Sequence, residues 1–222
     1  MKVWILNFHG IGKPHARVDE SERPYWVSET RFARCVELCA RHRATTAITF
    51  DDGNKSDIEV AAPALSAAGL TGSFFVLSDR VSHNHYLSAE NMRELVDRGM
   101  EVGTHGAAHL NWRHLPDGEL DRELVGARTA ISDIIGRPVT SAAIPFGSYN
   151  GHVLRALRRL GYARVYTSDG GATRNRAWLQ PRTSIRCDTD LTALEAAMTT
   201  GEPVARVVRR KVSMALRQAL PF

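Results

Sequence analysis

The chain alternates short apolar runs with longer helical patterns along most of its length, and this alternation restricts the fold more than any other feature. Repeated strand–helix units build a parallel sheet covered by helices, which is either closed into a barrel or open and doubly wound. A length of 222 residues suits a small or incomplete barrel. No Gly-rich loop of the dinucleotide or Walker type follows the first apolar run, which disfavours the nucleotide-binding open sheets. Periodicity alone leaves both architectures open.

Seven segments have the composition of strands, and six have the pattern of helices. The expected strands are Val3–Phe8, Thr45–Phe50, Gly72–Leu77, Glu101–Thr104, Val139–Ile144, Arg164–Thr167 and Arg182–Arg186. The expected helices are Ser28–Arg41, Ser56–Ala68, Ser88–Asp97, Asp117–Ile135, Asn150–Leu160 and Asp190–Thr199.

Several of these helices carry sequence signals for their ends. Side chains that accept hydrogen bonds from first-turn amides stand at Ser56, Ser88 and Asn150, which predicts N-caps. Residues that tolerate the left-handed conformation stand where helices should end, at Gly69, Gly99, Gly136 and Gly161.

Polar, titratable and glycine residues follow the expected strands. The carboxyl ends of parallel strands meet at one rim, and the active sites of such folds lie there. The segments after the first, second, fourth, fifth and sixth strands begin at His9, Asp51, His105, Pro145 and Ser168. The sequence therefore predicts a functional site at this rim.

Two of these segments have the composition of a metal site. His105 and His109 are four residues apart, so on a helical turn both imidazoles reach one ion. Nine histidines would produce roughly 0.4 such pairs by chance, so the spacing alone also fits an exposed or capping pair.

The carboxylates of Asp51 and Asp52 end an apolar strand, where they repel each other and lose solvation. A cation or a strong hydrogen-bond partner would offset this cost, although Asp-Asp-Gly also forms ordinary turns. One Asp with two His provides three ligands for a catalytic divalent ion with an open fourth position. The other Asp is then free to act as a general base.

Three segments in fixed order carry a resemblance to a known family. Thr49-Phe50-Asp51-Asp52-Gly53, His105-Gly106-Ala107-Ala108-His109 and Pro145-Phe146-Gly147-Ser148-Tyr149-Asn150 resemble successive motifs of polysaccharide deacetylases, the NodB-homology domain of carbohydrate esterase family 4. The resemblance spans roughly residues 3–186. It implies a distorted or incomplete (β/α) barrel of about seven parallel strands and a metal-dependent deacetylase of N-acetylated sugars.

The resemblance also implies roles for individual residues. Asp52, His105 and His109 would bind one divalent metal ion, Zn²⁺ in first place and Co²⁺, Ni²⁺ or Mn²⁺ as alternatives. Asp51 would be the base, and Arg182 would pair with it and orient it.

Substrate contacts are expected from the third motif and from an aromatic residue near the second. The motif residues are Pro145, Phe146, Gly147 and Tyr149, and a backbone N–H near Phe146 would hold the reacting oxygen. Trp112 follows the His109 loop closely and can stack on a sugar ring, with burial in the core as the alternative.

The sequence departs from the family pattern at three places. Ala142-Ala143-Ile144 stands where an Arg usually precedes the third motif, and Gly106 stands where Ser or Thr is common. The late Leu-x-x-His motif, which supplies the general acid, is absent, since no His follows His152. His9, directly after the first strand, is placed to supply the acid instead; the alternative is that it stabilises the Gly10/Gly12 turn.

These observations predict hydrolysis of the N-acetyl amide of an amino sugar, in a polysaccharide or a glycan precursor, by water with an Asp base and a His acid. One alternative keeps the chemistry but changes the substrate: a deformylase or deacylase of a lipid- or nucleotide-linked amino sugar. Another is a catalytically silent carbohydrate-binding domain of the same fold.

The net charge of +5 belongs to the last twenty residues, which hold five basic residues and no acidic one. Residues 1–202, the expected catalytic domain, are balanced, so a nucleic-acid partner is not expected. As a helix, the tail 203–222 would place its valines and alanines on one face and Arg206, Arg209, Arg210 and Arg217 on the other. Such a helix either lies on an anionic membrane or packs on the barrel with a solvated basic face.

Cysteine usage and the apolar runs bear on location. Three cysteines without a CxxC pair suggest a reducing environment. No apolar run reaches 18 residues, and the opening segment is too short and too polar for a signal peptide. We therefore expect a cytoplasmic protein, with peripheral contact at the inner membrane surface through residues 203–222.

Overall fold

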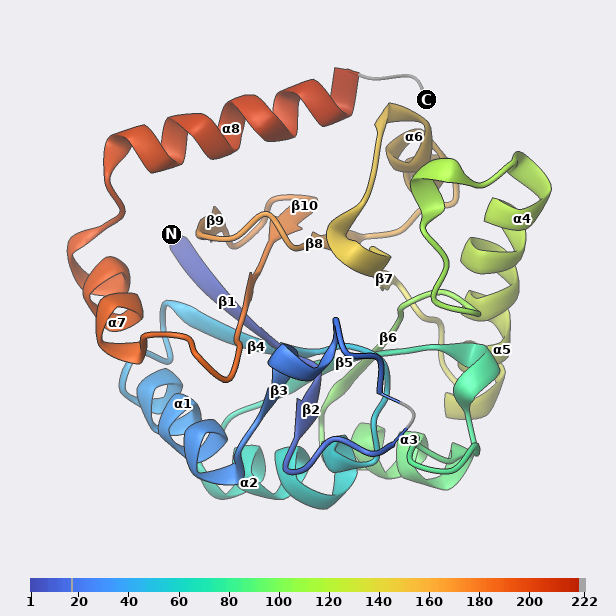
Figure 1. Cartoon of the computed structure of the whole chain (residues 1–222). Helices are drawn as coiled ribbons and strands as arrows, with labels where there is room; N and C mark the ends of the chain where they lie inside the picture. Colours follow the sequence, from blue (N-terminus) through green and yellow to red (C-terminus); the bar gives the residue numbers. More distant parts are fainter. Residues whose placement is uncertain (17, 220–222) are drawn as a thin grey trace.

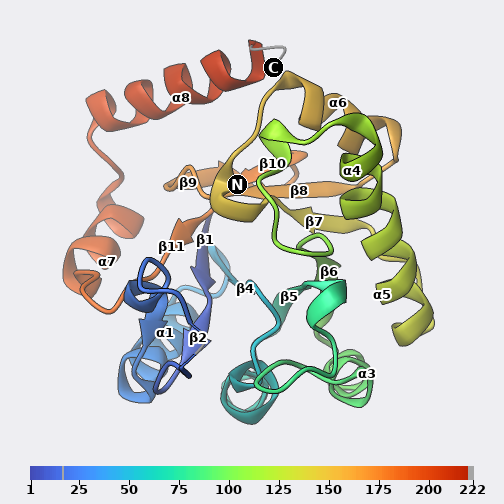
Figure 2. The ribbon, with the colours of Figure 1, turned by 45° about the vertical axis from the view of Figure 1, so that its right-hand side comes forward.

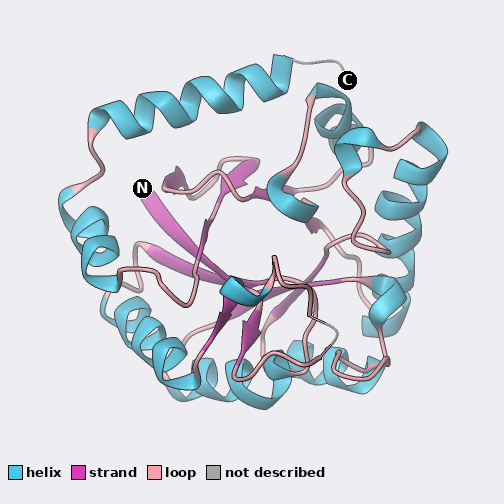
Figure 3. Ribbon diagram, viewed as in Figure 1, coloured by secondary structure: helices cyan, strands magenta, loops and turns pink. Residues whose placement is uncertain are grey.

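A nine-stranded sheet curls into a nearly closed barrel with helices around its outside, in a computed structural model that describes residues 1–16 and 18–219 (Figures 1 and 3). Neighbouring strands follow the order β10-β8-β7-β6-β5-β4-β1-β11, and β9 pairs with β1. The strands are β1 (Lys2–Phe8), β4 (Thr46–Phe50), β5 (Gly72–Val76), β6 (Glu101–Thr104), β7 (Ser141–Ala143), β8 (Arg164–Thr167), β9 (Ala172–Arg174), β10 (Leu179–Pro181) and β11 (Thr183–Ser184). All pairs in this sheet are parallel except β9 with β1, so the expected barrel is confirmed.

Helices follow most strands and cover the barrel wall. They are α1 (Glu29–Arg41), α2 (Ala62–Ala67), α3 (Ala89–Asp97), α4 (Asp117–Asp121), α5 (Ala127–Ile135), α6 (Gly151–Arg159), α7 (Leu191–Thr200) and α8 (Val204–Ala219). The short helices are the 3₁₀ turns η1 (Arg23–Tyr25), η3 (Ser78–Arg80), η4 (Trp112–His114) and η6 (Pro145–Gly147), and the π turns η2 (Asp57–Ala61) and η5 (Arg122–Gly126).

Stacked aromatic rings fill the core between the first strands and α1. The Phe8 ring packs on Phe32 and Phe50, and Phe50 stacks on Phe74 with ring centroids 4.5 Å apart. Cys35 and Cys39 lie on the same inner face of α1 and are fully buried. Burial raises the pKa of Cys39 to about 12, so this thiol is an inert core residue, as expected.

Most of the helix-end signals act as predicted. Ser88 forms a capping box with Asn91, and the Asn150 side chain accepts the Val153 N–H. All four glycines expected at helix ends have positive φ. Ser56 is the exception: it does not cap its helix, and its hydroxyl instead accepts the Ile11 N–H at 3.2 Å.

Two expected helices contain π turns. The segment 117–135 is continuous, but five of its residues form η5 between α4 and α5. The segment 56–68 begins with η2 just before Pro63, which has no N–H to complete an α-helical turn. Such turns change the direction in which the preceding side chains point, and they are frequent at functional sites.

The chain between β8 and α7 differs most from expectation. The expected strand Arg182–Arg186 is the two-residue β11, and β9 and β10 precede it. The short ladder of β2 (Gly10–Ile11) with β3 (Trp26–Val27) is also additional. Strands of two or three residues are too short to show a period of two, so sequence pattern does not reveal them.

Helix α8 lies across the outside of the barrel, beyond α7 and close to α6, in both views (Figures 1 and 2). The predicted helical tail is confirmed, and its expected basic face is solvated only in part: Arg206 and Arg209 are exposed, whereas Arg210 and Arg217 are not. Arg210 and Arg217 lie on the inner side of α8, where Arg210 pairs with Glu202 in the connection between α7 and α8, and Arg217 pairs with Asp169 after β8. No helix among residues 1–16 and 18–219 is long and apolar enough to cross a membrane.

Candidate active site

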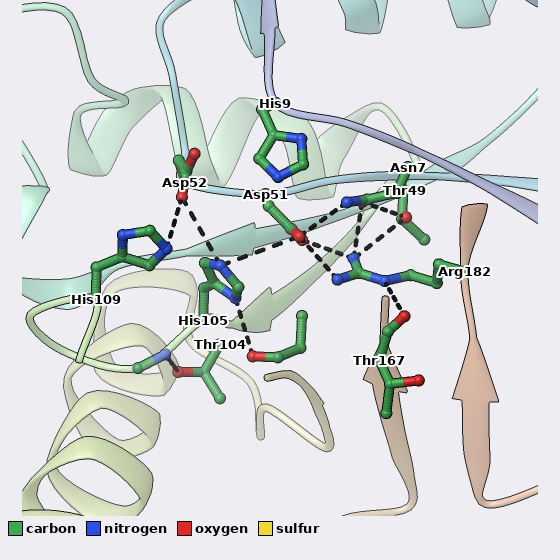
Figure 4. Close-up of polar contacts among 12 residues, drawn as sticks. Asn7, His9, Thr49, Asp51, Asp52, Thr104, His105, His109, Thr167 and Arg182 are labelled. Carbon is green, nitrogen blue, oxygen red and sulfur yellow. Dashed lines mark hydrogen bonds and ion pairs between the residues drawn. The ribbon is translucent and has the colours of Figure 1, made fainter. Parts of the chain in front are cut away.

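Asp52 lies at the end of β4 in a left-handed backbone conformation, with φ of 77° followed by 67° at Gly53. This turn aims its carboxylate at the loop after β6. Its Oδ1 lies 3.7 Å from His105 Nε2 and 3.6 Å from His109 Nε2 (Figure 4). Asp52 is 5% exposed, yet Oδ1 has no hydrogen-bond partner among the residues that the structure describes.

The two histidines direct their Nε2 atoms at Asp52. His105 Nδ1 donates to the Ala143 carbonyl at 2.9 Å, which leaves Nε2 unprotonated and directed at Asp52. Burial, with a contribution from His109, lowers the pKa of His105 to about 4. The carboxylate of Glu22 lies 3.7 Å from Nδ1 of His109, on the side away from Asp52.

These three side chains fit a divalent cation. Their ligand atoms lie within 4.8 Å of one another, and a buried carboxylate oxygen without a donor is otherwise costly. Two imidazole nitrogens and one carboxylate oxygen form a ligand set typical of catalytic zinc, with a further position left for water or substrate. The structure thus brings together the three predicted ligands, and it does not distinguish Zn²⁺ from other divalent ions.

Asp51 has a different environment from its neighbour. Arg182 donates to both of its oxygens, from Nη1 at 2.6 Å and from Nη2 at 2.7 Å, and Asn7 Nδ2 donates at 2.9 Å (Figure 4). Burial opposes ionisation, but the Arg182 guanidinium and then His105 outweigh it, so the pKa of Asp51 lies well below its ordinary value. Asp51 is therefore an ionised carboxylate, with Oδ2 only 4.0 Å from His105 Nε2.

The arginine missing before the third motif is not needed for this pairing, since Arg182 occupies both oxygens of Asp51. Arg182 Nη1 also donates to Asn7 Oδ1 at 2.8 Å, and Thr49 donates to the same oxygen. Sequence analysis did not select Asn7 or Thr49. A signal was present, because both are polar residues inside apolar strands, where a buried polar group requires a partner.

His9 follows β1 and points toward Asp51 from the side opposite Arg182 (Figure 4). Its Nδ1 is buried without a hydrogen-bond partner, and its ring packs on Tyr25 with centroids 4.8 Å apart. The His9 ring is thus held at the site by Tyr25, and its Nδ1 makes no hydrogen bond within the described part of the chain.

Within the third motif, Phe146 is the exposed side chain. It is 60% exposed, has φ of 58°, and lies with its ring centroid 4.4 Å from that of His109. Pro145 and Gly147 are buried beneath it. Gly147 has φ of 60°, and a Cβ there would lie 2.8 Å from Ser168, so only glycine fits.

Two predicted substrate contacts are corrected. Trp112 is fully buried, and its indole N–H donates to Glu123 at 3.0 Å. Tyr149 is 1% exposed, and its hydroxyl donates to Asp169 at 2.9 Å. Both rings pack in the core under the rim and present no face to a sugar.

Glu123 supports the histidine loop and was missed by sequence analysis. Its carboxylate accepts the Ala107 and Ala108 N–H groups at 3.1 and 2.9 Å, besides the Trp112 indole. It lies in the π turn η5, and nothing in the sequence distinguishes it from the other acidic residues of that helical segment. It also explains Gly106: a Cβ there would lie 2.3 Å from Glu123 Oε2, and φ is 92°.

Comparison with known proteins identifies the family. The family model described as polysaccharide deacetylase matches residues 40–165, a stretch that includes Asp51, Asp52, His105, His109 and Phe146. A Bacillus subtilis (strain 168) protein named as a polysaccharide deacetylase, YxkH, is 28% identical over 125 residues. This alignment covers 56% of the present chain and 45% of that protein, so the chain spans less than half of that relative's length.

Solved structures share the fold. The Streptococcus pyogenes deacetylase PplD in complex with acetate superimposes with a TM-score of 0.78 at 20% identity, covering 91% of this chain and 99% of that one. IcaB from Ammonifex degensii superimposes with a TM-score of 0.73 at 20% identity, covering 90% and 97%. Since the family model covers more than half of the sequence, this chain belongs to the polysaccharide deacetylase family.

Proposed function

We propose that this protein hydrolyses the N-acetyl amide of an amino sugar in a polysaccharide or a glycan precursor, with one divalent metal ion, Zn²⁺ in first place. The observation that carries the proposal is the buried Asp52 oxygen without a hydrogen-bond donor, which faces Nε2 of both His105 and His109. When bound to these residues, a divalent ion lowers the pKa of a water and polarises a carbonyl oxygen.

Asp51 is the base in this proposal. Its carboxylate is ionised, and Oδ2 faces the ligand atoms while Arg182 and Asn7 prevent it from rotating away. It accepts the proton of the attacking water. Because the strong pairing with Arg182 lowers its basicity, the scheme requires a water that is already acidified.

His9 is the proposed acid. Its ring lies across the site from Arg182, and Nδ1 has no partner within the described part of the chain. In this proposal, a ring nitrogen of His9 donates the proton to the departing amine of the sugar. Phe146 supplies an exposed aromatic face beside His109 for the sugar ring. By the family resemblance, a backbone N–H near Phe146 would hold the carbonyl oxygen.

The proposal is tested by measuring acetate and formate release from N-acylated sugars that are free, polymeric, lipid-linked or nucleotide-linked. Release of acetate should require added divalent metal and stop with a chelator. Asp51→Asn and His105→Ala should each abolish it, and His9→Ala should lower kcat about 10² to 10⁴-fold. His114→Ala, an exposed histidine outside the site, is the matched control.

Formate release without acetate release would favour a deformylase, and release only from a lipid- or nucleotide-linked sugar would favour the deacylase alternative. Sugar binding without any hydrolysis would favour the silent binding domain. Undiminished acetate release by both Asp51→Asn and His105→Ala would refute the proposed chemistry.

A further inference from the structure

Helix α8 is turned in an unusual way: two of its arginines, Arg210 and Arg217, lie on its inner side, while a row of large apolar side chains lies toward solvent. Residues four apart share one side of a helix, and four of them here are large and apolar. Val204 is 76% exposed, Val208 52%, Val212 53% and Leu216 62%. We call these four residues the α8 strip. In the described part of the chain, they are half of the large apolar side chains that are exposed.

Polar contacts hold the other face of α8 against the body. Arg210 makes a bidentate pair with Glu202, at 2.7 Å from each guanidinium nitrogen, and both side chains are largely buried. Arg217 pairs with the buried Asp169. These arginines, with Arg206, Ser213 and, at its edge, Arg209, line a cavity of about 650 Å³ between α8 and the barrel.

This orientation leaves the α8 strip without a partner. An amphipathic helix on a soluble barrel normally buries its apolar face, because that burial is what stabilises its docking. Here specific ion pairs fix the opposite orientation, so the strip is displayed outward. Within residues 1–16 and 18–219, Figures 1 and 2 show no other element on the outer side of α8.

The charges beside the strip indicate what covers it. On the helix, Lys211 flanks the strip on one edge and Arg209 on the other, and both are exposed. Helix α8 contains no acidic residue. An apolar face bordered by cations matches the boundary of an anionic bilayer, where phosphates meet acyl chains.

A second copy of the chain fits less well. Symmetric pairing of two α8 helices would bring Lys211 and Arg209 of one copy near those of the other, with no carboxylate on either helix to compensate. The strip, from Val204 to Leu216, is about 18 Å long and about 10 Å wide. It covers a few hundred Å², against about 800 Å² per partner in a stable protein interface.

We propose that α8 docks this protein on an anionic membrane surface, with the α8 strip in the interfacial region and Arg209 and Lys211 at the headgroups. This inference concerns where the protein acts. Since vesicle binding is measured without substrate, its outcome is independent of the proposed deacetylase chemistry.

The test is flotation of the full chain with vesicles of phosphatidylcholine alone and of phosphatidylcholine mixed with phosphatidylglycerol in equal parts. We expect binding to the mixed vesicles only, decreasing as salt is raised. The variant Val208→Ser/Val212→Ser/Leu216→Ser should lower binding by about tenfold or more. Its control is Val125→Ser, which changes a comparably exposed valine in η5 and should bind as the wild type does.

The charge contribution is tested with Arg209→Gln/Lys211→Gln, which should lower binding to mixed vesicles several-fold and reduce its dependence on salt. The control Lys2→Gln/Arg43→Gln removes two exposed cations from elsewhere on the molecule. All variants change exposed side chains, and unchanged thermal unfolding checks that they fold.

Three results would overturn the proposal. The wild type could fail to float with the mixed vesicles, or the triple serine variant could float as well as the wild type. Sedimentation velocity could also show that the wild type is a dimer and the triple serine variant a monomer, which would assign the strip to contact with a second copy.

Discussion

The adjacent aspartates at the end of β4 have opposite surroundings. Asp51 is paired on both oxygens by Arg182, whereas Asp52 Oδ1 faces two imidazole nitrogens and has no donor. One residue can therefore remain an ionised base while the other binds a cation. Three site residues that are not glycine, Asp52, His109 and Phe146, have positive φ, an energetically unfavourable conformation that is concentrated at functional sites.

Gly106 should tolerate no side chain. A Cβ would meet Glu123 Oε2 at 2.3 Å, and the φ of 92° is unfavourable for any other residue. We expect Gly106→Ala to lower the free energy of unfolding by about 2 kcal/mol or more and to weaken metal binding, because Glu123 holds the histidine loop. Chemical denaturation and metal titration measure both effects. Gly118→Ala, at a position in α4 with no atom near the added methyl, should be neutral or stabilising.

Asp57 is a fully buried carboxyl in η2 whose two oxygens have no hydrogen-bond partner. Burial, together with the carboxylates of Asp52 and Asp51, raises its pKa well above the ordinary value. The folded state thus keeps a proton that the unfolded chain releases above about pH 4. Stability from this group is present below that pH and is lost as pH rises toward the raised pKa.

Asp57→Asn should remove the loss of folding stability that the buried Asp57 carboxyl causes as pH rises. In chelator-treated protein, the variant should have nearly the wild-type Tm at about pH 4 and exceed it by about 3 °C or more at about pH 8. Differential scanning calorimetry at both pH values measures the difference. Asp133→Asn, an exposed position in α5, should change Tm equally at both. A Tm difference independent of pH would contradict the argument.

At the scale of elements, the attachment of α8 to the barrel depends on a few polar contacts. Arg217 donates to Asp169, which also accepts hydrogen bonds from Tyr149 and Thr167, so α8 is connected to the loop that carries Phe146. Arg217→Met should remove the link at this end of the helix while Asp169 keeps its two hydroxyl donors. We expect faster amide hydrogen exchange confined to Val204–Ala219 and a loss of about 1–2 kcal/mol in the free energy of unfolding.

Arg209→Met is the matched control for that change, because Arg209 is exposed on the same helix and makes no ion pair within the described residues. Its exchange rates should equal those of the wild type. Equal protection of α8 in both variants would mean that the Arg217 pair does not hold the helix.

Elements with a long pattern could be predicted from the sequence, and so could the side chains at strand ends. Before Asp51 and His105, an apolar run predicts a strand, and the polar motif that follows it predicts a site residue at the carboxyl end of that strand. The expected contact of Trp112 with a sugar relied on its nearness to His109 in sequence, which does not determine the direction of the side chain. The Trp112 ring turns inward and donates to Glu123. Glu123 and Glu22 reach the site through a π turn and a long loop, and local pattern carries no sign of either.

At the scale of the whole molecule, metal binding should add to folding stability, since the three ligands come from two separate parts of the barrel. Zn²⁺ at 100 times its Kd should stabilise the fold by about 2.7 kcal/mol, which corresponds to a rise in Tm of roughly 5–10 °C. Thermal unfolding with and without Zn²⁺ after chelation measures it. His109→Ala should abolish the rise and His114→Ala should retain it; a rise that persists in His109→Ala would place the ion elsewhere.

Arg182 also joins the two ends of the sheet. Its backbone N–H and its Nε both donate to the Thr167 carbonyl of β8, while its guanidinium reaches Asn7 on β1 and Asp51 after β4. A descendant of this chain could therefore lose activity by mutation of His105 or His109 and still fold. Loss of Arg182 would instead leave the buried carboxylate of Asp51 unpaired and would remove the contacts that join β8 to β1. During divergence, we expect Arg182 to outlast the histidines, so its presence in a related sequence marks the architecture and the histidines mark the chemistry.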